Sequence, residues 1–154
     1  KSLLRHPRVI SPLAEMTDGS FQKILSDEEV SLEDADRLLF CTGKIYYDLI
    51  EAREEKKLKN VAIMRIEQLY PLNVDELLAS ISQLPKGKQI YWVQEEPTNM
   101  GAWPYIKLIF SDELSRHYDL KRVSRVESAS PSTGSMAAHK LEQAELIDEA
   151  LADL

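Results

Sequence analysis

Several short polar stretches of this sequence carry residue types that bind ligands or catalyse reactions, and each also has a purely structural interpretation. Thr42-Gly43-Lys44 lies between an expected strand and an expected helix, where backbone N–H groups and a lysine can hold an anion. A phosphate loop needs an earlier glycine and a Ser or Thr directly after the lysine, and Ile45 stands there instead. We therefore expect a tight turn that requires Gly43, rather than a nucleotide-binding loop.

Glu95 and Glu96 are adjacent carboxylates at the end of an apolar run, where they could anchor a partner or the neighbouring part of the chain. Consecutive residues of a strand point to opposite faces, so this pair does not form a facing acid and base. Charged groups at such positions are often only structural. We therefore favour neutralisation of a helix dipole together with ion pairing to a nearby arginine.

The stretch from Ser128 to Gly134 places hydroxyl groups and flexible backbone just after the last expected strand. It could hold a phosphate with the help of Arg122 and Arg125. The simpler interpretation, which we adopt, is a turn that caps the last helix.

The histidines and the cysteine offer no site by their spacing. His6, His117 and His139 lack the spacing of metal ligands, and each is expected at the surface. Cys41 stands in an apolar run, which predicts a buried and inert thiol. A single cysteine excludes an internal disulfide and fits a reducing compartment.

Composition and charge narrow the class of protein. The chain has 154 residues, enough for one domain, and its net charge of −7 with no basic block argues against binding nucleic acid or an anionic membrane. No stretch is long and apolar enough to span a bilayer, and no signal peptide is visible. The chain begins with Lys1 rather than methionine, so we expect it to belong to a longer polypeptide.

Residues 1–36 are expected to form an arm or linker from a preceding domain, and residues 37–154 an α/β domain. Proline, glycine and acidic residues interrupt any long periodicity in the arm, although residues 21–25 could pair as an edge strand. In the second part, apolar runs predict strands at 38–42, 61–66, 90–93 and 122–126. The last of these is the most charged, which places it near a sheet edge.

Helical spacing predicts the elements between these strands. Helices are expected at 45–57, after an Asn73 cap, at 104–117, and after Gly134. Arg53 is placed on the outer face of the first helix. The last helix is expected to carry on one side, facing the core, Leu141, Ala144, Ile147, Ala150, Leu151 and Leu154. The alternation predicts a mostly parallel, doubly wound sheet with helices on both faces.

Longer motifs connect these elements to a known family. They are KSLLRHP at 1–7, CTGKIYYDL at 41–49, RIEQLYP at 65–71, QEEP at 94–97 with Asn99, Gly101, Ala102 and Trp103, and SASP at 128–131 with Gly134 and His139. In order and spacing the whole chain resembles the carboxyl-terminal domain of the thiamine-diphosphate-dependent first component of 2-oxoglutarate dehydrogenase. One departure is Ser124-Arg125, where that family usually carries Gly-Arg.

The resemblance implies a transketolase C-terminal-domain-like fold of about five strands with one antiparallel edge strand. It implies an enzyme that decarboxylates 2-oxoglutarate and passes succinyl to a lipoyl group in the citric acid cycle. Thiamine diphosphate and Mg would then lie on preceding domains, so we expect no catalytic, cofactor-binding or metal-binding residue here. The implied partners are those domains, a homodimer partner and the lipoyl succinyltransferase core. The location would be the bacterial cytoplasm or the mitochondrial matrix.

Two sets of contacts follow as hypotheses. Some members of the family respond to nucleotide-like effectors such as acetyl-CoA, which suggests Lys1, Arg5 and Lys44 as phosphate contacts, with Arg125 as a further anion contact. The alternative is that Arg5 and His6 only pack the arm onto the catalytic domains. Glu95, Glu96, Asn99 and Trp103 are expected at an interface, although core packing also explains the tryptophan.

Two other functions stay open at this stage. The chain could be a non-catalytic docking or effector-binding module that recruits the succinyltransferase core. It could also be the last domain of a related thiamine enzyme, such as transketolase or the pyruvate or branched-chain dehydrogenases. The motif from Gln94 to Trp103 favours the 2-oxoglutarate branch.

Overall fold

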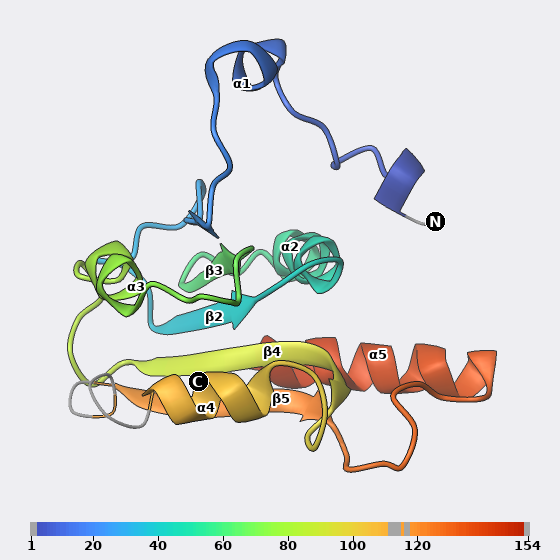
Figure 1. Ribbon diagram of the computed structural model, residues 1–154. Coiled ribbons are helices and arrows are strands. Elements are labelled where there is room, and N and C mark those ends of the chain that lie inside the picture. The colour runs from blue at the N-terminus through green and yellow to red at the C-terminus, as the bar shows by residue number, and fades with distance from the viewer. Residues whose placement is uncertain (1–2, 111–114, 116–117, 153–154) are drawn as a thin grey trace.

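A five-stranded sheet of order β1-β3-β2-β4-β5 forms the centre of the molecule (Figure 1). The computed structural model describes residues 3–110, 115 and 118–152. The strands are β1 (Ile24–Leu25), β2 (Arg37–Cys41), β3 (Val61–Ile66), β4 (Gln89–Pro97) and β5 (Asp119–Arg125). The helices are η1 (Leu3–Arg5), α1 (Leu13–Asp18), α2 (Ile45–Lys56), α3 (Val74–Ser80), α4 (Trp103–Phe110) and α5 (Met136–Ala150).

Strands β2 to β5 are parallel, and β1 alone runs antiparallel, paired with β3 at the edge of the sheet. The predicted α/β class, the mostly parallel sheet and its antiparallel edge strand are therefore confirmed. The predicted edge strand at 21–25 is present in shortened form, and the charged strand β5 occupies the opposite edge as expected.

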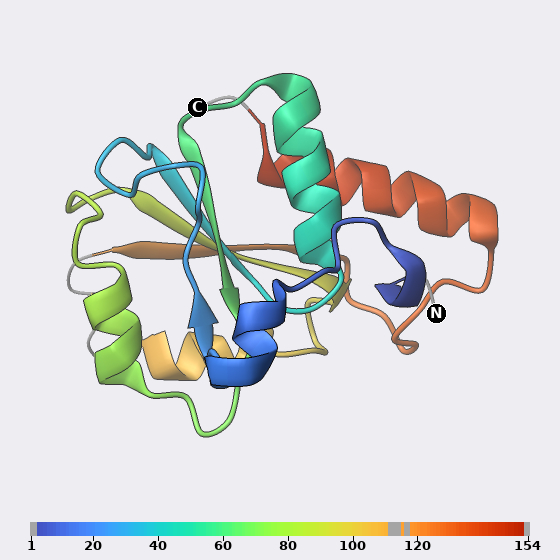
Figure 2. The same cartoon turned by 90° about the horizontal axis from the view of Figure 1, so that it is seen from above.

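Two apolar layers cover the two faces of the sheet, because side chains alternate along each buried strand. Leu38 and Phe40 of β2 enter a core with α3 and α4, whereas Leu39 and Cys41 enter the other core with α2 and α5. Figure 2 shows these two pairs of helices on opposite sides of the sheet. The sheet is doubly wound, as predicted.

Helix boundaries follow local signals where such signals exist. Asn73 caps α3, and its side chain accepts a hydrogen bond from the Glu76 backbone N–H at 3.2 Å. For α4 the structure gives Trp103–Phe110, and the predicted end near His117 lies outside the described residues.

Two predictions about helix faces are wrong. Arg53 of α2 points inward, with a side chain only 3% exposed, because carboxylates from the segment before β2 surround it. On α5, Leu141 is 61% exposed and Ala144 is also exposed. The inner face instead uses Leu146 together with Ile147, Ala150 and Leu151. Leu154 lies outside the described residues.

Strand β4 is longer than the apolar run that predicted it. It continues through Glu95 and Glu96 to Pro97, because β5 pairs alongside as far as Arg125. The pairing with β5 changes register between Val93 and Pro97 at this end. The two glutamates therefore lie in the strand rather than in the loop that follows it.

The N-terminal arm contains η1 and α1 and extends away from the sheet (Figure 1). Its last part belongs to the packed body, since Val30, Leu32 and Ala35 lie in the core with α3 and α4. The division at residue 36 stays a prediction. In the described part of the chain, no helix has both the length and the apolarity to cross a bilayer.

Candidate functional site

The carboxyl ends of β2 and β4 meet where the sheet changes winding direction. The chain passes from β2 through α2 to β3 on one side, and through α3 to β4 on the other. Ligands of open α/β sheets usually bind at such a switch point. A cavity of about 350 Å³ opens there, lined by residues that include Thr42, Trp92, Gln94, Glu95 and Tyr105.

Lys44 lies at this switch point, and two carboxylates compensate the positive charge of its ammonium group. Its Nζ donates to Asp48 Oδ2 at 2.6 Å and to Glu95 Oε1 at 3.1 Å. Burial alone would lower the pKa of Lys44, but the hydrogen bonds to both carboxylates outweigh it and raise the pKa. The partner of Glu95 is thus a lysine, not the expected arginine. The expected turn is present, with Gly43 at a φ of +69°.

A chain of hydrogen bonds extends from Asp48 across to β5. Asp48 Oδ2 accepts from Gln143 Nε2 of α5 at 2.8 Å, and Gln143 Oε1 accepts from Arg125 Nη2 at 3.1 Å. We call the whole set the carboxyl-edge network; it consists of Lys44, Asp48, Glu95, Arg125, Thr133, His139, Glu142 and Gln143.

Arg125 is the most connected member of this network, and its side chain is 8% exposed. It donates to His139 Nδ1 at 2.9 Å and to Thr133 Oγ1 at 3.2 Å, and its Nε lies 3.4 Å from Glu142 Oε2. The predicted anion contacts Lys44 and Arg125 are therefore joined through the same network, and each is already engaged by side chains of this chain.

The arm residues of the predicted effector set are not joined to this network. Lys1 lies outside the described residues, and Arg5 is exposed, with no contact to the carboxyl-edge network in the described part of the chain. His6 is half-buried and its ring lies 5.2 Å from the ring of Tyr47, so it packs the arm onto α2. An effector role for Lys1, Arg5, Lys44 and Arg125 stays a prediction.

The histidines are less exposed than expected. His6 and His139 are both half-buried, one against Tyr47 and the other against Arg125, and His117 lies outside the described residues. Cys41 is buried, as predicted, and burial raises the pKa of its thiol. Among the described residues, no three His, Cys, Asp or Glu side chains are grouped as ligands of a metal ion.

The four residues expected at an interface have different environments. Glu95 is engaged by Lys44, and Glu96 is exposed. Asn99 forms two hydrogen bonds with the Ser128 backbone, at 3.0 and 3.2 Å, and so fastens the loop after β4 to the loop after β5. Trp103 is 8% exposed and belongs to the core. An interface role for this set stays a prediction.

Gln94 organises the loop after β4, and the sequence reasoning missed it. Its side chain is buried, and its Oε1 accepts from the Trp92 indole at 2.8 Å and from the Trp103 backbone N–H at 2.9 Å. Its Nε2 donates to the Met100 carbonyl at 2.8 Å. An amide directly after an apolar strand was the available signal, because buried amides need such partners.

The loop from Ser128 to Gly134 lines a second cavity of about 340 Å³. Four carboxylates also line it, from Glu127, Glu142, Glu145 and Glu149. Arg122 is not among the lining residues and donates to Thr98 Oγ1 at 3.1 Å. Arg125 does line the cavity, but its guanidinium is engaged by Thr133, His139 and Gln143, and four carboxylates outnumber it. The charge around this cavity therefore opposes phosphate binding. The cap of α5 is Ser135, whose side chain accepts from the Ala138 N–H at 3.4 Å.

A solved structure shares this arrangement of sheet and helices. A chain described as "Split gene transketolase, inactive beta4 tetramer" matches 94% of this chain and 45% of its own length, with a TM-score of 0.60 and 16% sequence identity. The fold is therefore that of a transketolase-like α/β domain. The model of the family described as "2-oxoglutarate dehydrogenase C-terminal" matches residues 10–151, and this chain belongs to that family.

Curated relatives agree with this assignment. The chain is 43% identical to the 2-oxoglutarate dehydrogenase E1 component of an Exiguobacterium species over 98% of its own length, and 40% identical to that of Haemophilus influenzae over 98%. A mycobacterial protein named multifunctional 2-oxoglutarate metabolism enzyme is 38% identical over 99% of the chain. The chain spans only 16% of the first two relatives and 12% of the third.

Proposed function

We propose that this chain is the C-terminal domain of an enzyme that decarboxylates 2-oxoglutarate with thiamine diphosphate and Mg and passes succinyl to a lipoyl group. Within that enzyme it acts as a structural and interface domain, and the chemistry takes place on other domains. Membership of the 2-oxoglutarate dehydrogenase C-terminal family and the names of the relatives support the parent activity.

The structural role is supported mainly by the way the carboxyl-edge network satisfies its own charges. A magnesium–diphosphate group at the switch point would need free carboxylate oxygens, but Glu95, which lines the cavity there, and Asp48 both bind the Lys44 ammonium. Arg125 is likewise surrounded by Thr133, His139 and Gln143. This donor set does not fit thiamine diphosphate, and we assign these groups to holding β4, β5, α2 and α5 together.

The proposed partners follow from the same assignment. They are the preceding domains of the parent enzyme, a second copy of that enzyme in a homodimer, and the lipoyl succinyltransferase core of a multienzyme complex. Because the first relatives are bacterial, the proposed location is the bacterial cytoplasm.

Calorimetry tests whether the cofactor binds to this chain or only to the parent enzyme. Thiamine diphosphate with Mg is titrated into the 154-residue chain, whose fold is first checked by circular dichroism, and into the parent enzyme. We expect binding and 2-oxoglutarate decarboxylation only in the parent. Micromolar binding to the 154-residue chain would overturn the structural role. Capture of the succinyltransferase core by the 154-residue chain alone would favour a docking module instead.

A further inference from the structure

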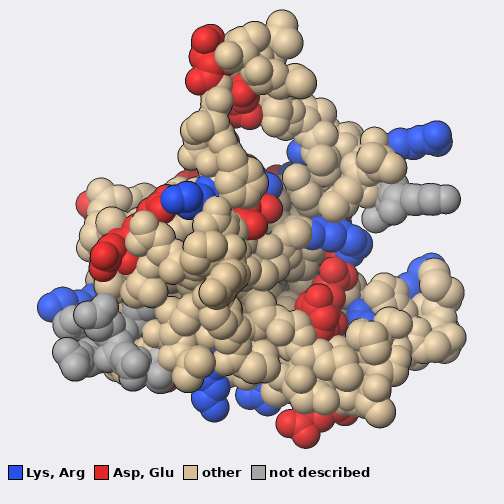
Figure 3. All heavy atoms as spheres, viewed as in Figure 1, with Lys and Arg blue, Asp and Glu red and all other residues tan. Residues whose placement is uncertain are grey.

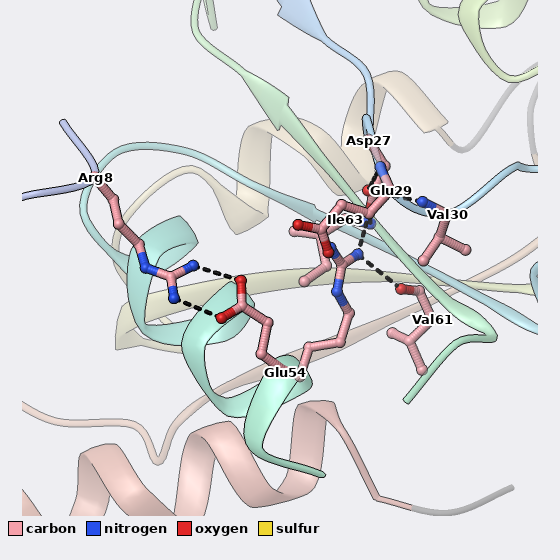
Figure 4. A network of polar contacts seen from close by, with 8 residues as sticks. Arg8, Asp27, Glu29, Val30, Glu54, Val61 and Ile63 are labelled. Carbon is pink, nitrogen blue, oxygen red and sulfur yellow. Dashed lines mark hydrogen bonds and ion pairs between the residues drawn. The ribbon is translucent and has the colours of Figure 1, made fainter. Parts of the chain in front are cut away.

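Both ends of one arm segment are fastened to neighbouring residues of helix α2 (Figure 4). At the N-terminal end, the Arg8 guanidinium forms two hydrogen bonds with the Glu54 carboxylate. At the other end, Asp27 pairs with Arg53. Residues 9–26 lie between these two ion pairs, and we call them the arm loop. Its ends are therefore fixed relative to the folded body. The loop ends in β1 (Ile24–Leu25), which pairs with β3 in the sheet, and the part before β1, with α1, extends outside the body.

The arm loop exposes large apolar side chains. Ile10 is 82% exposed, Leu13 75%, Met16 79% and Phe21 68%. Helix α1, which lies in the middle of the loop, buries none of its residues. Figure 3 shows the loop standing away from the body, made mostly of uncharged residues, with open space beneath it. Large apolar side chains exposed together on one short segment are typical of a contact with another protein surface.

From this geometry we infer that the arm loop is a docking element, and that it inserts into an apolar groove on the part of the parent enzyme that lies outside these 154 residues. The inference rests on the proposed function, because it takes the parent from the relatives. This chain spans only 16% of their length, so most of the surface available for burial lies elsewhere.

Covalent linkage favours this occupant over a separate protein, and the fixed ends of the loop favour docking in general. Covalent linkage to the rest of the parent gives its surface a high effective concentration near the loop, so a modest apolar contact is enough to keep the loop docked. The ion pairs on Arg53 and Glu54 hold the ends of the loop in place before contact, which lowers the entropy lost on docking.

Hydrogen exchange tests the contact directly. Amide exchange of residues 9–21 is measured in the parent enzyme and in the 154-residue chain. We expect exchange in the parent to be slower by roughly tenfold or more, because docking opposes local opening. Equal exchange in the two proteins would overturn the inference. Protection that appears in the 154-residue chain as its concentration rises would overturn the assigned occupant and favour a second copy.

Matched variants of the parent distinguish a specific contact of the arm loop from a general effect of removing exposed apolar side chains. The pair Ile10→Ser and Met16→Ser should restore fast exchange in residues 9–21. The control pair Val126→Ser and Met136→Ser removes side chains of similar exposure, 84% and 74%, and should leave the protection unchanged. Protection that survives the arm pair would overturn the inference.

Decarboxylation of 2-oxoglutarate is measured on the same parent samples, so that the two proposals fail separately. An active parent with an unprotected arm loop removes only the docking inference. A parent that does not decarboxylate 2-oxoglutarate removes the proposed function, and the exchange data still report whether the loop is covered.

Discussion

Arg53 and Asp27 form an ion pair buried between α2 and the segment that follows β1, with side chains 3% and 4% exposed. Arg53 also donates to the Val61 carbonyl at 3.2 Å and to Glu29 Oε2 at 2.8 Å. Asp27 Oδ2 accepts from the Ile63 backbone N–H at 2.7 Å, a donor on the sheet edge just beyond the two residues of β1. The pair therefore closes the edge of the sheet and holds the base of the arm.

Substitution of Arg53→Met should destabilise the chain strongly. The change keeps an apolar stem but leaves the Asp27 carboxylate buried without its cation, and breaking such a pair costs about 3–5 kcal/mol. The free energy of unfolding is measured by urea denaturation of the 154-residue chain. Arg8→Met is the matched control, because its pair with Glu54 is 38% and 40% exposed, and it should change stability little. Equal losses for the two variants would contradict the assigned difference in burial.

Two glycines with nearly the same backbone angle should respond differently to alanine. Gly43 has a φ of +69° and open space where an alanine Cβ would lie, whereas a Cβ on Gly101, at +68°, would lie 2.8 Å from the Gln94 amide nitrogen. Gly43→Ala should cost about 1–2 kcal/mol from backbone strain alone. Gly101→Ala should cost about 1–3 kcal/mol more, since it also overpacks a buried amide. Equal unfolding midpoints for the two variants would show that the loop around Gly101 shifts to make room for the added Cβ.

Loss of the Gln94 amide should loosen the segment from Trp92 to Trp103. In Gln94→Leu the Trp92 indole and the Trp103 backbone N–H lose their acceptor, and each buried group left unpaired costs about 1–3 kcal/mol. Gln89→Leu on the same strand removes the bond from the Tyr91 hydroxyl, the one side-chain bond of Gln89 among the described residues, and serves as the control. Urea denaturation and tryptophan fluorescence report the change, and unchanged fluorescence in Gln94→Leu would argue against this role.

The ion pair between Arg8 and Glu54 joins the arm to α2, and its contribution to stability should depend on pH. The hydrogen bond with Arg8 lowers the pKa of the Glu54 carboxyl below its ordinary value of 4.5. A carboxyl with a lowered pKa in the folded state stabilises that state above pH 4.5 and loses this effect as the pH falls through the lowered value. An NMR titration of carboxyl carbons should show Glu54 returning to its ordinary range in Arg8→Ala. Asp36, whose pKa is lowered by Lys88, should not move.

Cys41 should resist alkylation until the chain unfolds. The thiol is buried, and burial raises its pKa, so the reactive thiolate is scarce in the folded state. Because the folded-state pKa lies above the ordinary 9.0, rising pH beyond 9.0 favours the unfolded chain. Iodoacetamide labelling is followed with and without urea. Labelling of the native chain as fast as that of the unfolded chain would contradict burial of this thiol.

The order of residues along the chain was enough to predict the sheet and the family. Apolar runs placed β3 at Val61–Ile66 and paired buried strands with intervening helices, because burial on both faces imposes that pattern on the residues of each strand. Asn73 marked the start of α3, because capping depends on residues only three positions apart. The motifs from Gln94 to Trp103 and around Gly43 pointed to the family that the comparisons then established.

The use of the charged side chains, in contrast, became visible only in three dimensions. Helical periodicity assigned Arg53 to the outside, yet its side chain is buried because it binds carboxylates 24 and 26 residues away. The bond between Asp48 and Gln143 joins residues 95 positions apart. Local spacing carries no information about such pairs, because the free energy of an ion pair depends on distance and burial in space.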